Sequence, residues 1–431
     1  MSDRSFGQAP IDGWPAAAIT AGIMAALLVP ASLLTLIGLN YDTANGGAWE
    51  KVHPGSDLIL LGLAAAALRS GAPGPWLVAQ GRRYPGAAAF VATTLFLLIY
   101  QMVVLHAPFT PLIDTFLIPV AALVGLQDLH PAWKHRLEAA LHLFIAANAL
   151  LGIAEFVSGW RLIPAELDGV VQTAEVEARA FGFLGHPLSS AAMAGLYATV
   201  LMLGGGRGLP AGLRAPALGL QALALGAFGG RTALVLAALA AVAIAGVALV
   251  RVLAGRPVDL RLVGLGLLLA PLGLGMVAAI ASSGFFDVVL NRFIEDNGSA
   301  KSRGIILTVF GYLSWPDLLF GPDPDALASV LHLVGIEVGV ESTWLGFILN
   351  DGLLPSLVFF TGFGLFIAEV MRRCAPAAWG VMLFFFGIIS TSIGLSAKTT
   401  MLVEVVALLL ILLPPGAPHR RARFLPTPAF P

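Results

Sequence analysis

The chain has 431 residues, of which 58% are hydrophobic and only 11% are charged, and its mean hydropathy is +0.88. This composition excludes a soluble globular domain and predicts an all-α polytopic membrane protein. The formal net charge of −1 favours no class of partner, and we expect no nucleic acid as a partner. The single cysteine, Cys374, excludes an intrachain disulfide.

Apolar runs separated by Pro, Gly and charged residues predict about 12 transmembrane helices. We interpret the first run as a retained span rather than a signal peptide, because no small-residue cleavage site follows it. The second predicted span is short and rich in alanine. The approximate bounds are 16–39, 57–69, 86–105, 110–127, 136–157, 187–203, 213–228, 232–252, 260–281, 353–371, 377–394 and 400–413.

Lysine and arginine are distributed unevenly over the connections between these spans. With the N-terminus in the cytoplasm, sixteen of the 24 basic residues lie inside and eight outside, which predicts both termini inside. The predicted organisation is a transmembrane bundle over 1–281 that includes an outer loop at 158–186. A large periplasmic loop at 282–351 follows, and then 352–431, with the last three spans and a cytoplasmic tail.

Three arginines on the predicted outer side stand near helix starts. Arg179 lies in RAFGFLGHP, Arg231 follows a Gly-Gly turn, and Arg303 lies at the start of SRGIILTVFGYL in the large loop. Helix N-termini present free N–H groups, and arginine adds a permanent charge whose geometry matches phosphate. We therefore expect a receptor for a lipid-linked pyrophosphate. The alternative for each arginine is a contact with lipid headgroups or with a nearby carboxylate.

Four further side chains are candidates for substrate contact. Glu341 opens ESTWLGFILNDG, and Glu337 lies four residues earlier, so on a continuous helix the two carboxylates would share a face. A carboxylate such as Glu341 at the bilayer edge can act as general base towards a sugar hydroxyl, or it can simply cap a helix. His186 is expected to act as a proton carrier, to donate to phosphate, or simply to cap the helix ahead of Pro187. Lys398 either adds a cation to an outer pocket or contacts headgroups.

The sequence gives little sign of a metal or a cofactor. Asp323-Pro324-Asp325 has the D-x-D spacing of metal-dependent glycosyltransferases, but the two prolines of GPDPD make a rigid turn the simpler interpretation. H-E-x-x-H, Cys-cluster, Walker A and G-x-S-x-G motifs do not occur. We predict no required metal, nucleotide or other cofactor.

Four segments between about residues 175 and 371 resemble, in order, motifs of the bacterial O-antigen ligase and Wzy-type polysaccharide polymerase superfamily. They are RAFGFLGHPLSSAAMAGL, GGRTALVLAAL, SRGIILTVFGYLSWPDLLFGPDPD and VESTWLGFILNDGLLPSLVFF. Leu188 stands where that family commonly has Asn. Glu341 takes the position of the ligase His, so the chain is more similar to the exopolysaccharide polymerases.

The resemblance implies a GT-C-like helical bundle in the bacterial inner membrane, with the active site on the periplasmic side. It implies polymerisation of an undecaprenyl-diphosphate-linked oligosaccharide, inverting and metal-independent. Arg179, Arg231 and Arg303 would then contact the pyrophosphate, and Glu341 would accept the proton of the acceptor hydroxyl. The expected partners are this lipid-linked oligosaccharide, the lipid bilayer, a chain-length regulator and export proteins.

Two alternatives remain open. One is O-antigen ligase-type transfer of a finished glycan to lipid A core or protein, which differs only in its acceptor. The other is a flippase for lipid-linked oligosaccharide, which requires interrupted helices and ionisable groups near mid-bilayer. Asp114, Glu155 and Glu404 are the few side chains of that kind.

Overall fold

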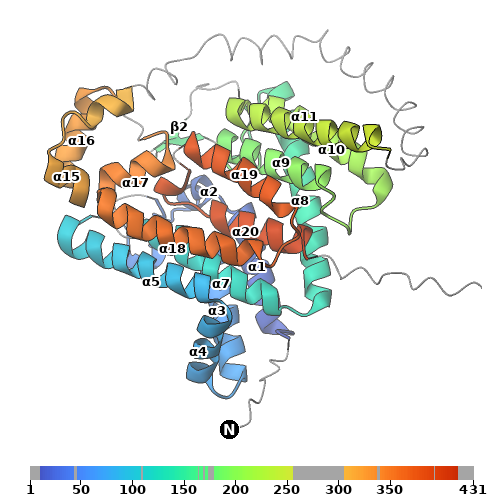
Figure 1. Ribbon diagram of the computed structural model, residues 1–431, viewed down its shortest axis with the longest axis horizontal. Coiled ribbons are helices and arrows are strands. Elements are labelled where there is room, and N and C mark those ends of the chain that lie inside the picture. Colours follow the sequence, from blue (N-terminus) through green and yellow to red (C-terminus); the bar gives the residue numbers. More distant parts are fainter. Residues whose placement is uncertain are drawn as a thin grey trace, which may run out of the picture.

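The computed structural model of this protein describes most of the chain and is predominantly helical (Figure 1). The predicted ninth span at 260–281, together with Arg303 and Glu337, lies outside the described residues. Those residues are 10–42, 46–107, 110–163, 165–167, 170–172, 179–255, 305–336, 340–392 and 394–415.

Helices alternate with short connections along the described chain, and one short antiparallel hairpin lies in the loop before α9. The elements of the first half are α1 (Trp14–Leu28), α2 (Ala31–Leu36), the 3-10 helix η1 (Ala48–Lys51), α3 (Pro54–Arg69), α4 (Pro73–Arg83), α5 (Pro85–Tyr100), the π-helical η2 (Gln101–Leu105), α6 (Thr110–Leu112), the π-helical η3 (Ile113–Leu117), α7 (Ile118–Asp128) and α8 (Pro131–Ser158). Those of the second half are β1 (Ala165–Leu167), β2 (Val170–Gln172), α9 (Pro187–Met202), α10 (Ala211–Phe228), α11 (Arg231–Leu253), α15 (Trp315–Phe320), α16 (Pro324–Leu333), α17 (Thr343–Asp351), α18 (Leu353–Met371), α19 (Ala378–Ser390), the 3-10 helix η4 (Gly394–Ser396) and α20 (Met401–Leu412).

Among the described residues, five helical segments are long and apolar enough to cross a membrane, or six if the bent pair α3 and α4 counts as one span. They are 85–105, 110–128, α8, α10 and α18. In the same part of the chain, other predicted spans hold four shorter apolar helices of 12 to 16 residues, α1, α9, α19 and α20, and the apolar stretch Arg231–Val247 that begins the 23-residue α11. At about 1.5 Å per residue the four shorter helices fall short of a bilayer core of about 30 Å. The structure is thus consistent with a helical membrane protein, but it does not confirm twelve spans.

One predicted span is interrupted, and another is followed by a helix that was not predicted. The span expected over 16–39 ends at Leu28, because Pro30 lacks an N–H and holds Val29 outside the helical region, so that α2 starts anew at Ala31. The span expected at 57–69 matches α3, and a bend of 114° after α3 leads into α4, which was not predicted. Hydropathy alone predicted neither the break at Pro30 nor the helix α4.

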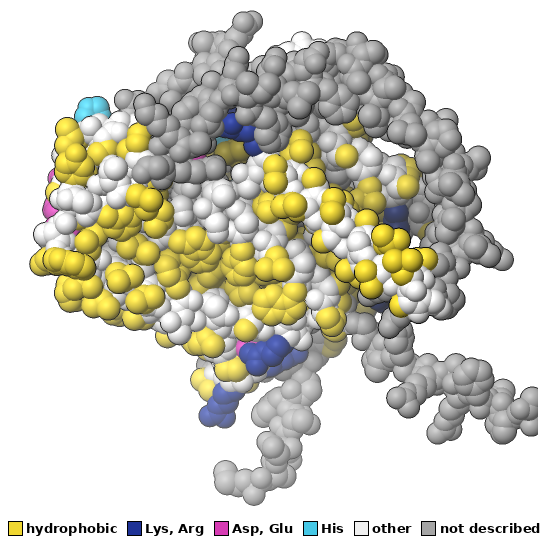
Figure 2. Space-filling model, turned by 45° about the horizontal axis from the view of Figure 1, so that its top comes forward, with side chains coloured by type: hydrophobic (Ala, Val, Ile, Leu, Met, Phe, Trp, Pro, Cys, Tyr) yellow, Lys and Arg dark blue, Asp and Glu magenta, His cyan; other side chains and the backbone are white. Residues whose placement is uncertain are grey.

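Several helix ends lie together at one end of the bundle, which we name the basic end. Hydrogen bonds join these helix ends. Arg373 donates to the Arg83 carbonyl oxygen over 3.0 Å, which joins the end of α18 to the start of α5. The N–H of Gly206 donates to the Leu412 oxygen over 2.7 Å, which joins the segment after α9 to the end of α20. Lysines and arginines gather at the lower edge of Figure 2, below a broad face of hydrophobic side chains.

The opposite end of the bundle, named the cavity end, holds the starts of α3, α9, α11 and α20. The helix α20 runs through the core with every residue from Leu402 to Leu412 buried. Beside it, η3, α17 and α18 are joined by an aromatic cluster in which the ring centroids of Phe116 and Phe347 lie 4.8 Å and 4.9 Å from that of Phe359. Thr115, next to Phe116, accepts from the Thr399 N–H over 3.1 Å, so η3 also contacts the residues that precede α20.

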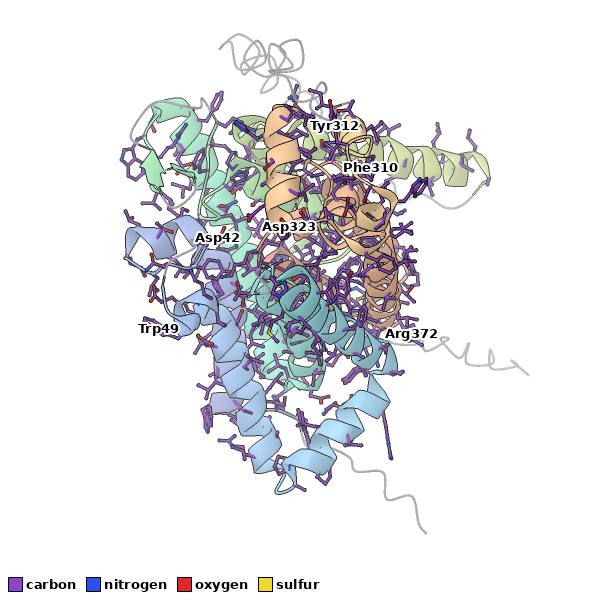
Figure 3. All side chains as sticks on the ribbon, turned by 90° about the vertical axis from the view of Figure 1, so that its left-hand side faces the viewer. Asp42, Trp49, Phe310, Tyr312, Asp323 and Arg372 are labelled. Carbon is purple, nitrogen blue, oxygen red and sulfur yellow. The ribbon has the colours of Figure 1, made fainter. Side chains whose placement is uncertain are left out.

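The described part of the large loop contains α15, α16 and α17 and forms a small cap on the bundle. It has its own hydrophobic cluster, formed by Ile306, Val309, Leu327, Ile336, Val340 and Leu349. Figure 3 shows Phe310 and Tyr312 of the cap on the side away from Arg372, which follows α18. Asp323 caps α16, because its carboxylate accepts from the N–H groups of Asp325 and Ala326, which favours a structural role for the D-x-D triplet.

Candidate functional site

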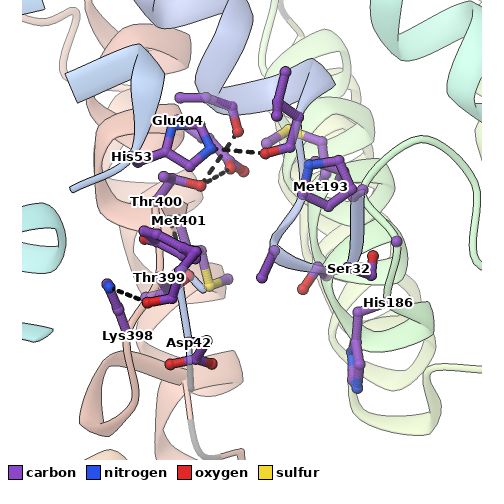
Figure 4. Close-up of a pocket in the computed structure, with 18 of the residues that line it drawn as sticks. Ser32, Asp42, His53, His186, Met193, Lys398, Thr399, Thr400, Met401 and Glu404 are labelled. Carbon is purple, nitrogen blue, oxygen red and sulfur yellow. Dashed lines mark hydrogen bonds between the residues drawn. The ribbon is translucent and has the colours of Figure 1, made fainter. Parts of the chain in front are cut away.

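A cavity of about 290 Å³ lies at the cavity end, between the break that separates α1 from α2, the start of α9 and the start of α20 (Figure 4). Two residues predicted from the sequence, His186 and Lys398, both line it. Its other polar lining residues are Ser32, Tyr41, Asp42, His53, Ser189, Thr399, Thr400 and Glu404. The cavity therefore contains side chains of both charges.

Lys398 is held in a fixed position in the cavity wall. Its Nζ donates to the Tyr41 carbonyl oxygen over 2.6 Å and lies 3.7 Å from the centroid of the Tyr41 ring. Burial lowers the pKa of Lys398, and the carboxylates of Asp114 and Asp42 oppose that shift. The ammonium group thus has a carbonyl and an aromatic face as partners, both of which favour a cation.

His186 is the N-cap of α9, as the simpler of the two sequence interpretations expected. Its Nδ1 accepts from the Leu188 N–H over 3.2 Å, so a neutral ring carries its proton on Nε2. The residue is exposed and lines the cavity, so capping does not exclude contact with a ligand.

His53 and the residues behind it stabilise the opposite wall. Its Nδ1 accepts from the Gly55 N–H, and its Nε2 lies 2.7 Å from the Val29 oxygen, so Nε2 is the donor in a neutral ring. Burial lowers the pKa of His53, which also favours the neutral form. Asp114 accepts from Tyr41 Oη and from the His53 N–H over 3.0 and 3.1 Å. We therefore interpret His53 and Asp114 as structural.

The loop that carries Arg179 is tied to the segment that carries Arg231. The Ala180 N–H donates to the Ala227 oxygen over 3.1 Å, four residues before Arg231. At Gly230 an added Cβ would lie 2.4 Å from the Cβ of Ala191, in the first turn of α9. The structure thus places Arg179, Arg231 and His186 on neighbouring segments at the cavity end, although neither arginine lines the cavity.

Glu341 is half-buried and lies two residues before α17, so it precedes the helix. Glu341 and Ser342 are not helical, so Glu341 does not lie on a helix face, and Glu337 lies outside the described residues. The Leu395 N–H donates to Thr343 Oγ1 over 3.0 Å, so the start of α17 contacts η4, close in sequence to Lys398. Glu341 is nevertheless not among the residues that line the cavity.

Glu404 lines the cavity and was not predicted as a site residue. Sequence reasoning noted it only as an acidic side chain in an apolar span, which is the signal that could have found it. Arg161 was likewise assigned no site role, and its guanidinium carbon lies 4.4 Å from the centroid of the Phe181 ring, close to Arg179 in sequence.

Comparison with models of known protein families found no match, and comparison with curated proteins found none either. The functional assignment therefore depends on the cavity, its residues and the physical chemistry of the bundle.

Proposed function

We propose that this protein is a membrane-embedded glycosyltransferase that polymerises a lipid-linked oligosaccharide. The donor is an undecaprenyl-diphosphate-linked oligosaccharide, and the acceptor is the lipid-linked repeat unit. The observation that carries the proposal is the cavity at one end of an apolar helical bundle, which Lys398 and His186 both line although they are far apart in the sequence.

The charges at this end suit a diphosphate leaving group. Lys398 supplies a cation in the cavity wall, and α9 and α20 both begin at the cavity, where helix N-termini favour anions. Arg179 and Arg231 lie on the segments beside it. Such groups stabilise the charge that develops on the diphosphate as the anomeric C–O bond breaks, which accelerates the transfer without a metal.

The same proposal includes a GT-C-like bundle of about twelve spans in a bacterial inner membrane. The apolar helices shorter than a bilayer core would cross it together with their polar flanks, and 260–281 would supply a further span. Because basic residues gather on the cytoplasmic side of membrane proteins, the basic end would face the cytoplasm and the cavity the periplasm.

The test is reconstitution of the purified protein in liposomes with a synthetic polyprenyl-diphosphate oligosaccharide, followed by electrophoresis of the products. We expect a ladder of polymer lengths, and at least about a tenfold lower rate for Lys398→Ala, since a charge-assisted contact is worth roughly 1.5–3 kcal/mol. Lys134→Ala is the matched control, because Lys134 also donates to a backbone oxygen, that of Gln127, but at the basic end. A wild-type protein that leaves the supplied repeat units unjoined would contradict the proposal. Transfer to lipid A core without elongation would identify a ligase.

A lipid-linked oligosaccharide flippase is the second candidate, because the helix break between α1 and α2 lines the cavity together with Glu404. Interrupted helices and buried acidic groups beside a cavity are expected of transporters. The two functions differ in the side on which single repeats accumulate when the protein is deleted. Periplasmic accumulation supports the polymerase, and cytoplasmic accumulation supports the flippase.

A further inference from the structure

Glu404 has few partners for a buried carboxylate. It lies in the first turn of α20, is 7% exposed and lines the cavity. Its Oε1 accepts from Thr400 Oγ1 over 2.8 Å. Within the described chain Oε2 accepts no hydrogen bond, and no cation pairs with this carboxylate. In Figure 4 Glu404 lies at the end of the cavity away from Asp42 and His186.

Two other buried glutamates are far better satisfied. Glu155 accepts three backbone N–H groups, and Glu369 accepts the N–H of Gly86 and pairs with Arg372 and Arg373. A buried carboxylate without such partners is costly, and proteins keep such groups mainly at functional sites. The unfavourable free energy of burying the Glu404 carboxylate therefore points to a ligand that supplies the missing hydrogen-bond partner.

A purely structural role does not account for Glu404. Thr400 Oγ1 also lies 3.2 Å from the Ala26 carbonyl oxygen, so this hydroxyl has an acceptor without the glutamate. A second polar group of the cavity, the buried hydroxyl of Ser32, has no hydrogen-bond partner among the described residues. The cavity thus offers a carboxylate and a hydroxyl to a ligand, together with the Lys398 cation, which suits a hydroxyl-rich ligand that carries an anionic group.

We infer that Glu404 is the general base of the transfer, in place of Glu341; this inference rests on the proposed function. The acceptor hydroxyl gives its proton to Glu404 Oε2 as its oxygen forms a bond to the anomeric carbon of the donor. The bond from that carbon to the phosphate oxygen breaks, and the electron pair leaves with the lipid diphosphate. The protonated Glu404 then releases its proton to water.

The test compares steady-state kinetics of Glu404→Gln, Glu404→Asp and Lys398→Ala in the liposome assay. A base that is lost lowers kcat by about 100-fold or more, so we expect that loss in Glu404→Gln, with the donor KM within about threefold of wild type. Glu404→Asp should be at least about tenfold faster than Glu404→Gln, because it restores a carboxylate. Lys398→Ala removes a contact to the diphosphate, so unlike Glu404→Gln it should raise the donor KM as well as lower the rate.

The outcomes distinguish failure of the Glu404 assignment from failure of the proposed polymerase function. If wild-type protein forms polymer and Glu404→Gln keeps its kcat, the assignment of Glu404 is refuted and the polymerase stands. A Glu404→Gln protein that is slow only because it unfolds early, as seen in its thermal unfolding, and that Glu404→Asp does not rescue, also refutes the assignment. If wild-type protein forms no polymer, both the function and the assignment fall.

Discussion

Glu155 anchors the loop between Arg179 and His186, and removing its carboxylate should destabilise the cavity end. The Phe181 and Gly182 N–H groups donate to Oε2 over 2.8 and 2.9 Å, and the Leu162 N–H donates to Oε1 over 3.1 Å. Phe181 and Gly182 are buried, whereas Leu162 is exposed and can bond to water instead. At roughly 2 kcal/mol for each buried donor left unsatisfied, Glu155→Ala should lower the free energy of unfolding by about 4 kcal/mol.

The assay is reversible unfolding of the purified protein in mixed micelles by titration with sodium dodecyl sulfate. Glu50→Ala is the matched control, because the Glu50 carboxylate also accepts three hydrogen bonds, from Asn40 N, Asn40 Nδ2 and Gly47 N. Its three donors are only half-buried, so water can replace the lost acceptor, and the effect should be smaller. If Glu155→Ala destabilises the protein no more than Glu50→Ala does, the role given to Glu155 is wrong.

Three further predictions follow from the geometry. Since burial lowers the pKa of Lys398, binding of a fluorescent polyprenyl diphosphate should weaken as the pH rises through that lowered value, and Lys398→Arg should abolish this loss; a flat wild-type profile would contradict it. Burial raises the pKa of Asp351 to about 6, so stability that is present below its usual value of 3.8 is lost as the pH rises through about 6. At about 1.4 kcal/mol per unit of pKa shift, the free energy of unfolding falls by roughly 3 kcal/mol. Asp351→Asn should not show this fall when its unfolding in micelles is measured at low and at neutral pH. Gly185→Ala should abolish polymer formation, because φ is +65° and its Cβ would lie 2.4 Å from Ser32 Oγ. Gly204→Ala, with φ +83° and open space, should bear only the backbone strain of about 1–2 kcal/mol and stay active.

Hydropathy was sufficient to predict most of the helices, because a long apolar run in lipid must satisfy its backbone groups within the segment. The predicted spans at 136–157 and 353–371 correspond to α8 and α18 within a few residues. The break at Pro30 was missed, because a window average over many residues does not resolve a local loss of helical geometry, and the short helix α4 was not predicted.

The chemistry of His186 and Lys398 could be proposed from residue type and flanking helix starts, but the sequence did not indicate that they share a cavity. That proximity depends on how α9 and α20 pack, and therefore on contacts between residues far apart in the chain. Glu404 shows the same limit. Its sequence marks it as one acidic residue among apolar neighbours, and only the tertiary structure distinguishes it from Glu155, because the packing gives Glu155 three hydrogen-bond donors and leaves Glu404 with one.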